Sequence, residues 1–283
     1  MWWKATVAIL GLVIALGITL VYVDKGLFNR KVEKEVKELF ESAETGEREV
    51  ITEEDLNGLP EPVQRHLRYA GVIGRKKIRT VRLKQEGRFR QGKSGSWMNF
   101  EAEQYYTTEP PGFIWKTDMN FLPLVSVIGR DKYYKGKGNM LIKLPPFIKI
   151  ADAKGDKIDQ GTLVRYLNEV MWFPTAYLSD YISWESIDSN SARAIMTDHG
   201  TTVSAVLHFD KSGRLVNFVA ERYYMAGGET SLETWSTPIE EYGERNGLRI
   251  PIKGKGVWKL DSGDFTYIEL EVTELEYGVP KGY

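Results

Sequence analysis

The sequence predicts a mainly β (α+β) protein: a curved antiparallel sheet or open half-barrel with a few packed helices, behind one N-terminal transmembrane helix. Three observations lead to this fold class. Residues 5–23 carry no charged side chain. Several later segments alternate apolar and polar side chains with the period of two that is typical of strands. Turns rich in glycine, proline and aspartate separate these segments, and many short strands joined by turns are typical of a barrel or a strongly curved sheet.

The uncharged run over residues 5–23 is long enough to cross a membrane, because about 20 apolar helical residues span the hydrocarbon core. Two tryptophans precede the run and a tyrosine closes it, as interfacial aromatic anchors do. The alternative is a cleaved signal peptide, but the exit at residues 22–25 reads YVDK and lacks the small residues of a cleavage site. We therefore predict an uncleaved, single-pass anchor in the cell membrane.

The charges that flank the run do not decide its orientation. Lysine and arginine are denser after the run than before it, which by itself would keep the following domain in the cytoplasm. However, Glu33, Glu35 and Glu38 are interleaved with these cations. Long domains also translocate largely regardless of flanking charge. From the residues alone, the topology stays open.

The chain divides into three predicted parts: a transmembrane anchor (1–25), an amphipathic helix with a linker (26–51) and a β-rich soluble domain (52–283). In the second part, apolar residues recur at helical spacing among lysines and glutamates. These residues are Phe28, Val32, Val36, Leu39 and Phe40. The amphipathic helix is expected to lead from the membrane to the domain.

The third part begins with short helices and then changes to strands. Thr52 and Asp55 are spaced to cap a first helical turn, and a second helix is expected from Pro60 or Pro62 to Tyr69. Strands are expected near 81–89, 97–106 and 113–119, with two more around Gly129-Arg130-Asp131. Later strands are expected near 181–187, 192–198, 201–209, 215–225, 230–236, 238–244, 255–260 and 265–277.

One clear helix interrupts the strands. Its apolar stripe consists of Leu163, Leu167, Val170 and Met171, and Pro174 is expected to end it. The aspartates before it are predicted to lie in a solvated loop, since their spacing does not match a calcium loop. These are Asp152, Asp156 and Asp159. The later segment Gly254-Lys255-Gly256 is predicted to be a hairpin turn.

Composition and motifs exclude several kinds of function. The net charge is −1, with both signs spread along the chain, whereas nucleic-acid binders usually carry a basic excess. The chain has no cysteine, which excludes disulfides and thiolate chemistry. Its three histidines lack metal-site spacing, and its short glycine turns lack phosphate-loop spacing. We therefore expect no nucleic-acid partner, no metal and no cofactor.

The segment from Arg165 to Pro174 is the strongest candidate for chemistry. Arg165 and Glu169 are four residues apart, so they share a helix face and can pair. The pair could be a surface salt bridge, but it adjoins Trp172, and partial desolvation would raise the pKa of Glu169. Aromatic residues such as Tyr106 and Trp115 either form core or line a cavity. The candidate ligand-binding residues are Arg130, Asp131, Arg165, Glu169, Trp172, Trp115 and Tyr106.

Two sequence segments together carry a family resemblance. Residues 59–68 fit the pattern L-P-x-x-V-Q-R-x-L-R, and residues 165–174 fit R-Y-L-x-E-x-x-W-x-P. With Gln104-Tyr105-Tyr106 and Gly129-Arg130-Asp131, they resemble an uncharacterised bacterial family, a domain of unknown function often carried behind a membrane anchor. The resemblance spans roughly residues 52–280 and implies no activity.

The predicted architecture is also similar to the lipoprotein-carrier fold of LolA-like proteins. These are open barrels with helices in the concave side, and they bind acyl chains. This likeness implies an extracytoplasmic location for the β-rich domain.

Three hypotheses about function remain open. In the first, a membrane-anchored domain binds a lipid or another apolar ligand in a half-barrel cavity, without catalysis. In the second, the protein is an envelope hydrolase or other enzyme that uses Glu169 and nearby arginine or aspartate. In the third, it is a scaffold that binds a protein partner at the membrane through an exposed sheet edge.

Overall fold

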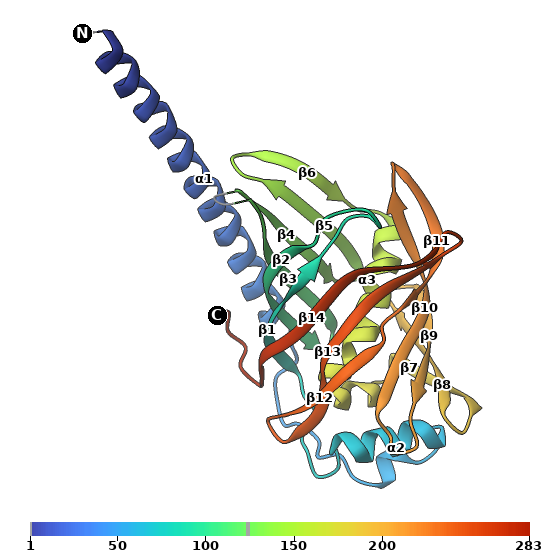
Figure 1. Cartoon of the computed structure of the whole chain (residues 1–283). Helices are drawn as coiled ribbons and strands as arrows, with labels where there is room; N and C mark the ends of the chain where they lie inside the picture. The colour runs from blue at the N-terminus through green and yellow to red at the C-terminus, as the bar shows by residue number, and fades with distance from the viewer. Residues whose placement is uncertain (1, 123–124) are drawn as a thin grey trace.

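A single antiparallel sheet dominates the computed structural model, which describes residues 2–122 and 125–283 (Figure 1). Within these residues, the sheet contains fourteen strands. The strands are β1 (Thr80–Phe89), β2 (Met98–Thr108), β3 (Pro111–Leu122), β4 (Val125–Tyr134), β5 (Lys137–Leu144), β6 (Ile148–Ala153), β7 (Ile182–Asp188), β8 (Ser191–Asp198), β9 (Thr201–Phe209), β10 (Leu215–Ala226), β11 (Glu229–Ser236), β12 (Ile239–Arg245), β13 (Leu248–Leu260) and β14 (Gly263–Tyr277).

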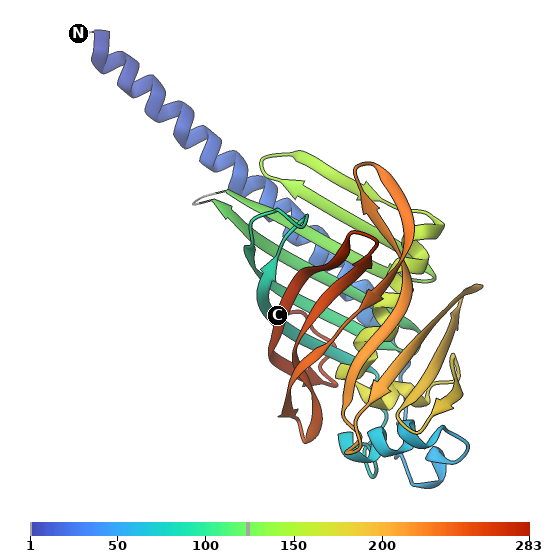
Figure 2. The ribbon, with the colours of Figure 1, turned by 45° about the vertical axis from the view of Figure 1, so that its right-hand side comes forward.

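The strand order makes the sheet an open half-barrel. Along the sheet the order is β6-β5-β4-β3-β2-β1-β14-β13-β11-β10-β9-β8-β7, and β12 pairs with β13. β6 and β7 therefore form its two edges (Figure 2). Register shifts interrupt several pairings, including β1 with β14 and β13 with β14. Such bulges increase the local twist of a sheet, which helps it to curve. The predicted fold class is confirmed.

The helices lie on both faces of the sheet and at one end of it. They are α1 (Trp2–Glu41), α2 (Glu61–Ala70) and α3 (Asp156–Glu169), with short 3₁₀ helices η1 (Glu54–Leu56), η2 (Val170–Trp172) and η3 (Pro174–Leu178). α3 lies in the concave side of the sheet (Figure 1) and packs against β3, β4, β5, β9 and β10. The apolar stripe predicted for this helix is buried in the main core.

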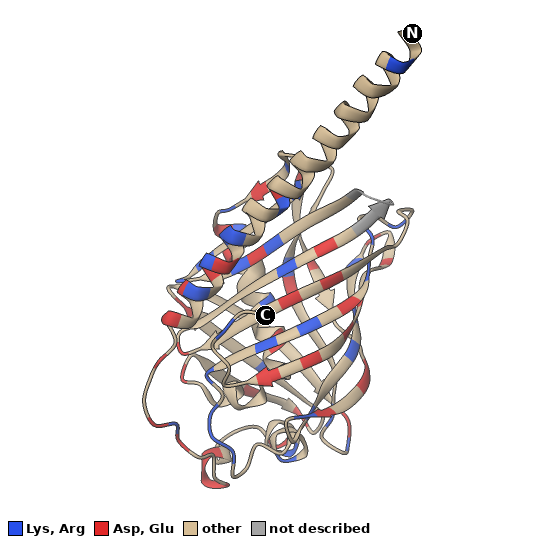
Figure 3. Cartoon of the chain, turned by 90° about the vertical axis from the view of Figure 1, so that its left-hand side faces the viewer, with Lys and Arg blue, Asp and Glu red and all other residues tan. Residues whose placement is uncertain are grey.

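The predicted membrane segment and amphipathic helix join into one continuous helix, α1. The exposed N-terminal half is long and apolar enough to cross a membrane. The C-terminal half packs on the convex face of the sheet (Figure 3). The second, smaller core between α1 and the sheet consists of Phe28, Val32, Val36, Leu39, Phe40, Tyr105, Ile114, Ile128 and Leu141. The amphipathic pattern thus buries its apolar face as expected.

Ion pairs also tie α1 to the convex face. Lys25 Nζ lies 2.8 Å from Asp118 Oδ2. Glu35 Oε2 lies 2.9 Å from Arg130 Nε, and Glu35 Oε1 lies 3.1 Å from Lys132 Nζ. α1 and the half-barrel are therefore connected by charge as well as by apolar packing.

The aspartates before α3 do not form the predicted solvated loop. Asp152 lies in β6, and Asp156 and Asp159 form the first turn of α3. Asp159 is buried and accepts a hydrogen bond of 2.7 Å from the Gly138 backbone N–H. The close approach of α3 to β5 explains this burial, because a Cβ atom at Gly138 would lie 2.6 Å from the Ile158 carbonyl oxygen.

Candidate functional site

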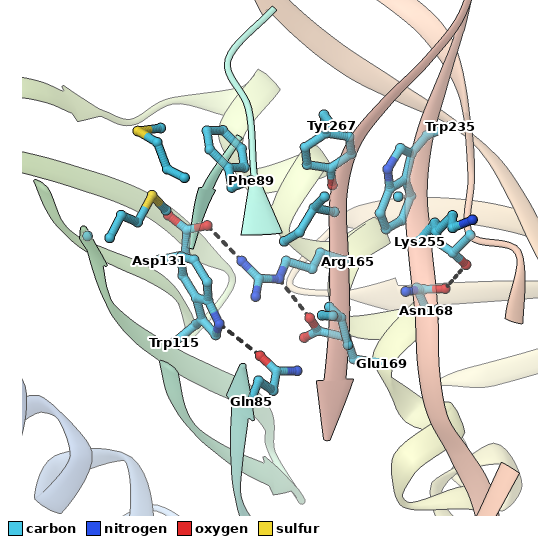
Figure 4. A pocket seen from close by; sticks show the side chains of 18 of the residues that line it. Gln85, Phe89, Trp115, Asp131, Arg165, Asn168, Glu169, Trp235, Lys255 and Tyr267 are labelled. Carbon is cyan, nitrogen blue, oxygen red and sulfur yellow. Dashed lines mark hydrogen bonds and ion pairs between the residues drawn. The ribbon is translucent and has the colours of Figure 1, made fainter. Parts of the chain in front are cut away.

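A cavity of about 580 Å³ lies between the sheet and α3 (Figure 4). Most of the side chains that line it are apolar or aromatic, and they come from most strands of the half-barrel. These are Phe89, Met98, Trp115, Met119, Val127, Met140, Ile142, Ile150, Met171, Trp172, Trp235, Pro238, Ile239, Pro251, Ile252, Tyr267, Ile268 and Leu270. The volume is within the range of small-molecule sites. The interior of the half-barrel is therefore hollow, as the first functional hypothesis requires.

Polar residues of α3 and β4 form a charged cluster on one wall of this cavity. Arg165 donates from Nε to Glu169 Oε1 at 2.8 Å and from Nη1 to Asp131 Oδ2 at 2.7 Å. The guanidinium also lies over the Trp115 ring, 4.8 Å from its centroid. One arginine thus bridges two carboxylates while its flat face contacts an aromatic wall, a geometry that lysine cannot provide.

The second carboxyl oxygen of Glu169 also accepts hydrogen bonds. Oε2 accepts hydrogen bonds from Gln104 Nε2 at 2.7 Å and from Tyr106 OH at 3.0 Å. Glu169 is only 4% exposed. Burial raises the pKa of the Glu169 carboxyl, while Arg165 and the two β2 donors oppose this shift. Burial also raises the pKa of Tyr106 well above its ordinary value, so this phenol stays a neutral donor.

The raised pKa of Glu169 gives a testable pH dependence. The folded chain keeps the Glu169 proton at pH values where the unfolded chain, with an ordinary value of 4.5, has released it. The contribution of Glu169 to stability is therefore fully present below pH 4.5 and is lost as the pH rises through the folded pKa. Glu169→Gln should remove this decline. Urea unfolding midpoints of both chains, measured between about pH 4 and pH 8, test this, and parallel profiles would contradict it.

The structure brings five of the predicted ligand-binding residues to the cavity. Asp131, Arg165, Glu169, Trp172 and Trp115 all line it. Whether they bind a ligand stays a prediction.

The two other candidates lie elsewhere. Tyr106 is buried behind the wall and holds Glu169. Arg130 points to the convex face, where it pairs with Glu35 and donates to Asn139 Oδ1 at 2.7 Å. Consecutive strand residues point to opposite faces, so Arg130 and Asp131 cannot both face the cavity, and Arg130 is removed from the candidate site.

Several cavity residues escaped the sequence-based prediction. Gln85 lines the cavity, and its Oε1 accepts a hydrogen bond of 3.0 Å from Trp115 Nε1. Arg222 on β10 stacks on the Trp235 ring at 4.6 Å. The period-two pattern already places Gln85 on the apolar face of its strand, and a polar residue there was the available signal. No comparable pattern pointed to Arg222.

Comparison with known proteins gives a family but no activity. The model of a family of unknown function, DUF6544, matches residues 49–270. The chain belongs to the DUF6544 family. The uncharacterised family predicted from its motifs is thereby confirmed. No curated protein matches the DUF6544 chain.

Three solved structures are similar to the DUF6544 chain. A DUF1329 family protein from Desulfovibrio piger has a TM-score of 0.44 at 10% identity, over 78% of this chain and 94% of that one. A candidate outer membrane lipoprotein-sorting protein domain from Vibrio parahaemolyticus has a TM-score of 0.39 at 12% identity, over 71% and 86%. A LolA-superfamily protein from Nitrosomonas europaea has a TM-score of 0.38 at 10% identity, over 76% and 91%.

Proposed function

We propose that this protein is a membrane-anchored carrier that holds a lipid or another apolar ligand in the half-barrel cavity, without catalysis. The cavity itself supports this proposal most directly. A hollow of about 580 Å³ with a mostly apolar lining leaves exposed the apolar surface that a close-packed interior would bury. An acyl chain would fill it and restore the missing contacts.

Binding is favoured over catalysis because the most buried carboxylate of the cluster, that of Glu169, is already held by three donors. Glu169 accepts three hydrogen bonds, and Arg165 bridges two carboxylates. A general acid or base must come within hydrogen-bond reach of a substrate proton, and the Glu169 carboxyl is buried in the cavity wall. Arg165 and Asp131 also line the cavity and have more exposed side chains than Glu169, so they are better placed to orient the polar end of a ligand.

The energetics of an acyl ligand suit reversible exchange with a membrane. Each methylene group moved from water into an apolar site contributes about 0.8 kcal/mol. A bilayer offers nearly the same gain, so the transfer of a chain between bilayer and cavity is close to neutral. Four methionines, Met98, Met119, Met140 and Met171, line the cavity. Their flexible side chains can adapt to ligands of different shape.

The continuity of α1 supports an anchor over a cleaved signal sequence. Cleavage after residue 23 would cut inside an unbroken helix. The residues that follow the cut belong to the fold, since Asp24 is buried and Lys25 pairs with Asp118. An extracytoplasmic location of the half-barrel remains part of the proposal.

A change that fills the cavity tests ligand binding. Met140→Trp should reduce the bound lipid several-fold, because the larger ring occupies part of the hollow. The full chain is purified from membranes in detergent and passed through gel filtration, and the retained lipid is quantified by mass spectrometry.

Met225→Trp is the matched control for this experiment. It introduces the same change at an exposed β10 position outside the cavity lining. Circular dichroism verifies that both variants are folded. Equal lipid in the two variants, or a parent chain without lipid, would refute the proposed cargo site.

A further inference from the structure

The tip of the β5–β6 hairpin exposes large apolar side chains. Phe147, Ile148 and Ile150 are 53%, 54% and 54% exposed. Single apolar residues are common on protein surfaces, whereas neighbouring exposed apolar side chains mark interaction sites; here three lie within four positions of the chain. The neighbouring Lys149 is also exposed and pairs with Asp152 at 3.2 Å. Apolar residues interspersed with lysine are typical of segments that lie in a membrane interface.

The β5–β6 hairpin is bonded to α1 at Asp24, the residue that follows the apolar run of α1. Asp24 is buried and accepts a hydrogen bond of 2.8 Å from the Phe147 backbone N–H through Oδ2. Its other oxygen, Oδ1, binds the Lys143 ammonium. The tip therefore lies level with the end of the uncharged run over residues 5–23. In Figures 1 and 2 the hairpin lies beside α1, on the side from which the N-terminal half projects, and α2 lies at the opposite end.

The same hairpin forms part of the cavity wall. Ile142 of β5 and Ile150 of β6 both line the cavity. Ile150 is thus at once a wall residue and part of the exposed patch. A surface that covered the patch would also adjoin the cavity.

We propose that Phe147, Ile148 and Ile150 insert into the headgroup region of the bilayer that α1 spans, so that the cavity opens next to lipid. This inference rests on the proposed anchor. The bilayer is the occupant because the Phe147–Asp24 hydrogen bond places the patch beside the end of the apolar run of α1. The insertion gives an acyl chain a route from membrane to cavity that avoids water.

The experiment uses the absence of cysteine from the chain. A single cysteine is introduced by Ile148→Cys and labelled with the fluorophore NBD. The full chain is reconstituted in vesicles of phosphatidylcholine and phosphatidylglycerol, with and without nitroxide-labelled lipid. Position 187 provides the control through Ile187→Cys. Ile187 is 47% exposed on β7, whose following turn contacts α2 through a hydrogen bond of 2.9 Å from Arg65 Nη2 to Ser189 O.

The expected result is blue-shifted emission at position 148 and several-fold stronger nitroxide quenching there than at position 187. A third variant, Leu12→Cys, reports on the anchor itself. Quenching at position 12 with equal, weak quenching at 148 and 187 would overturn the hairpin proposal and leave the anchor standing. Weak quenching at positions 12, 148 and 187 would overturn both the hairpin proposal and the proposed anchor. Blue-shifted emission at 148 without quenching would mean that protein covers the β6 edge, and it would also overturn the proposal.

Discussion

Arg165→Met is expected to lower the free energy of unfolding by about 3–5 kcal/mol, the usual cost of removing one partner of a buried ion pair. Arg165 is the cation that holds both Glu169 and Asp131. Without it, Glu169 keeps the donors Gln104 and Tyr106 but loses its counter-charge in a site that water barely reaches. Methionine retains most of the apolar volume, so the loss reports on charge more than on packing.

Denaturant unfolding of the detergent-solubilised chain near neutral pH measures this loss. Arg193→Met is the control, since Arg193 and Glu185 form an exposed pair at 3.6 Å, and a change there should cost no more than roughly 0.5 kcal/mol. The decrease in unfolding free energy caused by Arg165→Met should become smaller at acidic pH, because a protonated Glu169 has no charge to balance. Similar losses at positions 165 and 193 would show that the cluster contributes little to the fold.

The double variant Arg165→Met, Glu169→Gln distinguishes the effect of the unpaired Glu169 charge from the effect of the altered side-chain shape on stability. Removing the uncompensated carboxylate should recover about 2 kcal/mol relative to Arg165→Met alone, within the usual range of coupling between contacting residues. Strictly additive losses would mean that the two side chains act independently, against the 2.8 Å contact between them.

The sequence predicted correctly those helices and strands that are specified by patterns within a single short segment. The strand expected at 201–209 is β9 (Thr201–Phe209), and the helix expected to end at Tyr69 is α2, which ends at Ala70. In α2 the following Gly71 adopts the left-handed conformation, with φ 83°. Alternation and helix-stop residues act over a few positions, so one segment carries enough information.

Features that depend on distant partners were not predicted. Gly254-Lys255-Gly256 lies within β13 and is not the expected hairpin turn. Gly256 is there because a Cβ atom would lie 2.6 Å from Tyr267 Cε1 on the neighbouring β14. In a strand, glycine can thus mark a close approach of neighbouring side chains, and the sequence alone does not distinguish this role from a turn.

In the candidate site, too, the contact within one helix was predicted and the contact between distant segments was not. Helical spacing indicated the pairing of Arg165 with Glu169. That Asp131 meets Arg165 depends on the packing of α3 against β4, which no local pattern encodes. The alternation around Gly129-Arg130-Asp131 separates the two faces of the strand but does not say which face encloses the cavity.

Glu35→Ala is expected to cost about 3 kcal/mol of unfolding free energy, since it strands a buried cation on the convex face. Arg130 is 1% exposed. Among residues 2–122 and 125–283, Glu35 is its only carboxylate partner within 4 Å. The hydrogen bonds from Arg130 to Asn139 remain in the variant, but an amide carries no net charge to balance a guanidinium.

Glu38→Ala, three residues along the same helix, is the matched control for Glu35→Ala. Glu38 has a side chain that is 49% exposed and lies 3.8 Å from Lys34, so its loss should cost roughly 0.5 kcal/mol or less. Both variants are compared by denaturant unfolding of the full chain in detergent. A large difference means that α1 is a structural part of the half-barrel through its charge as well as its apolar face. Equal, small losses would mean that α1 can lift away and let water solvate Arg130, and the helix would then be a tether alone.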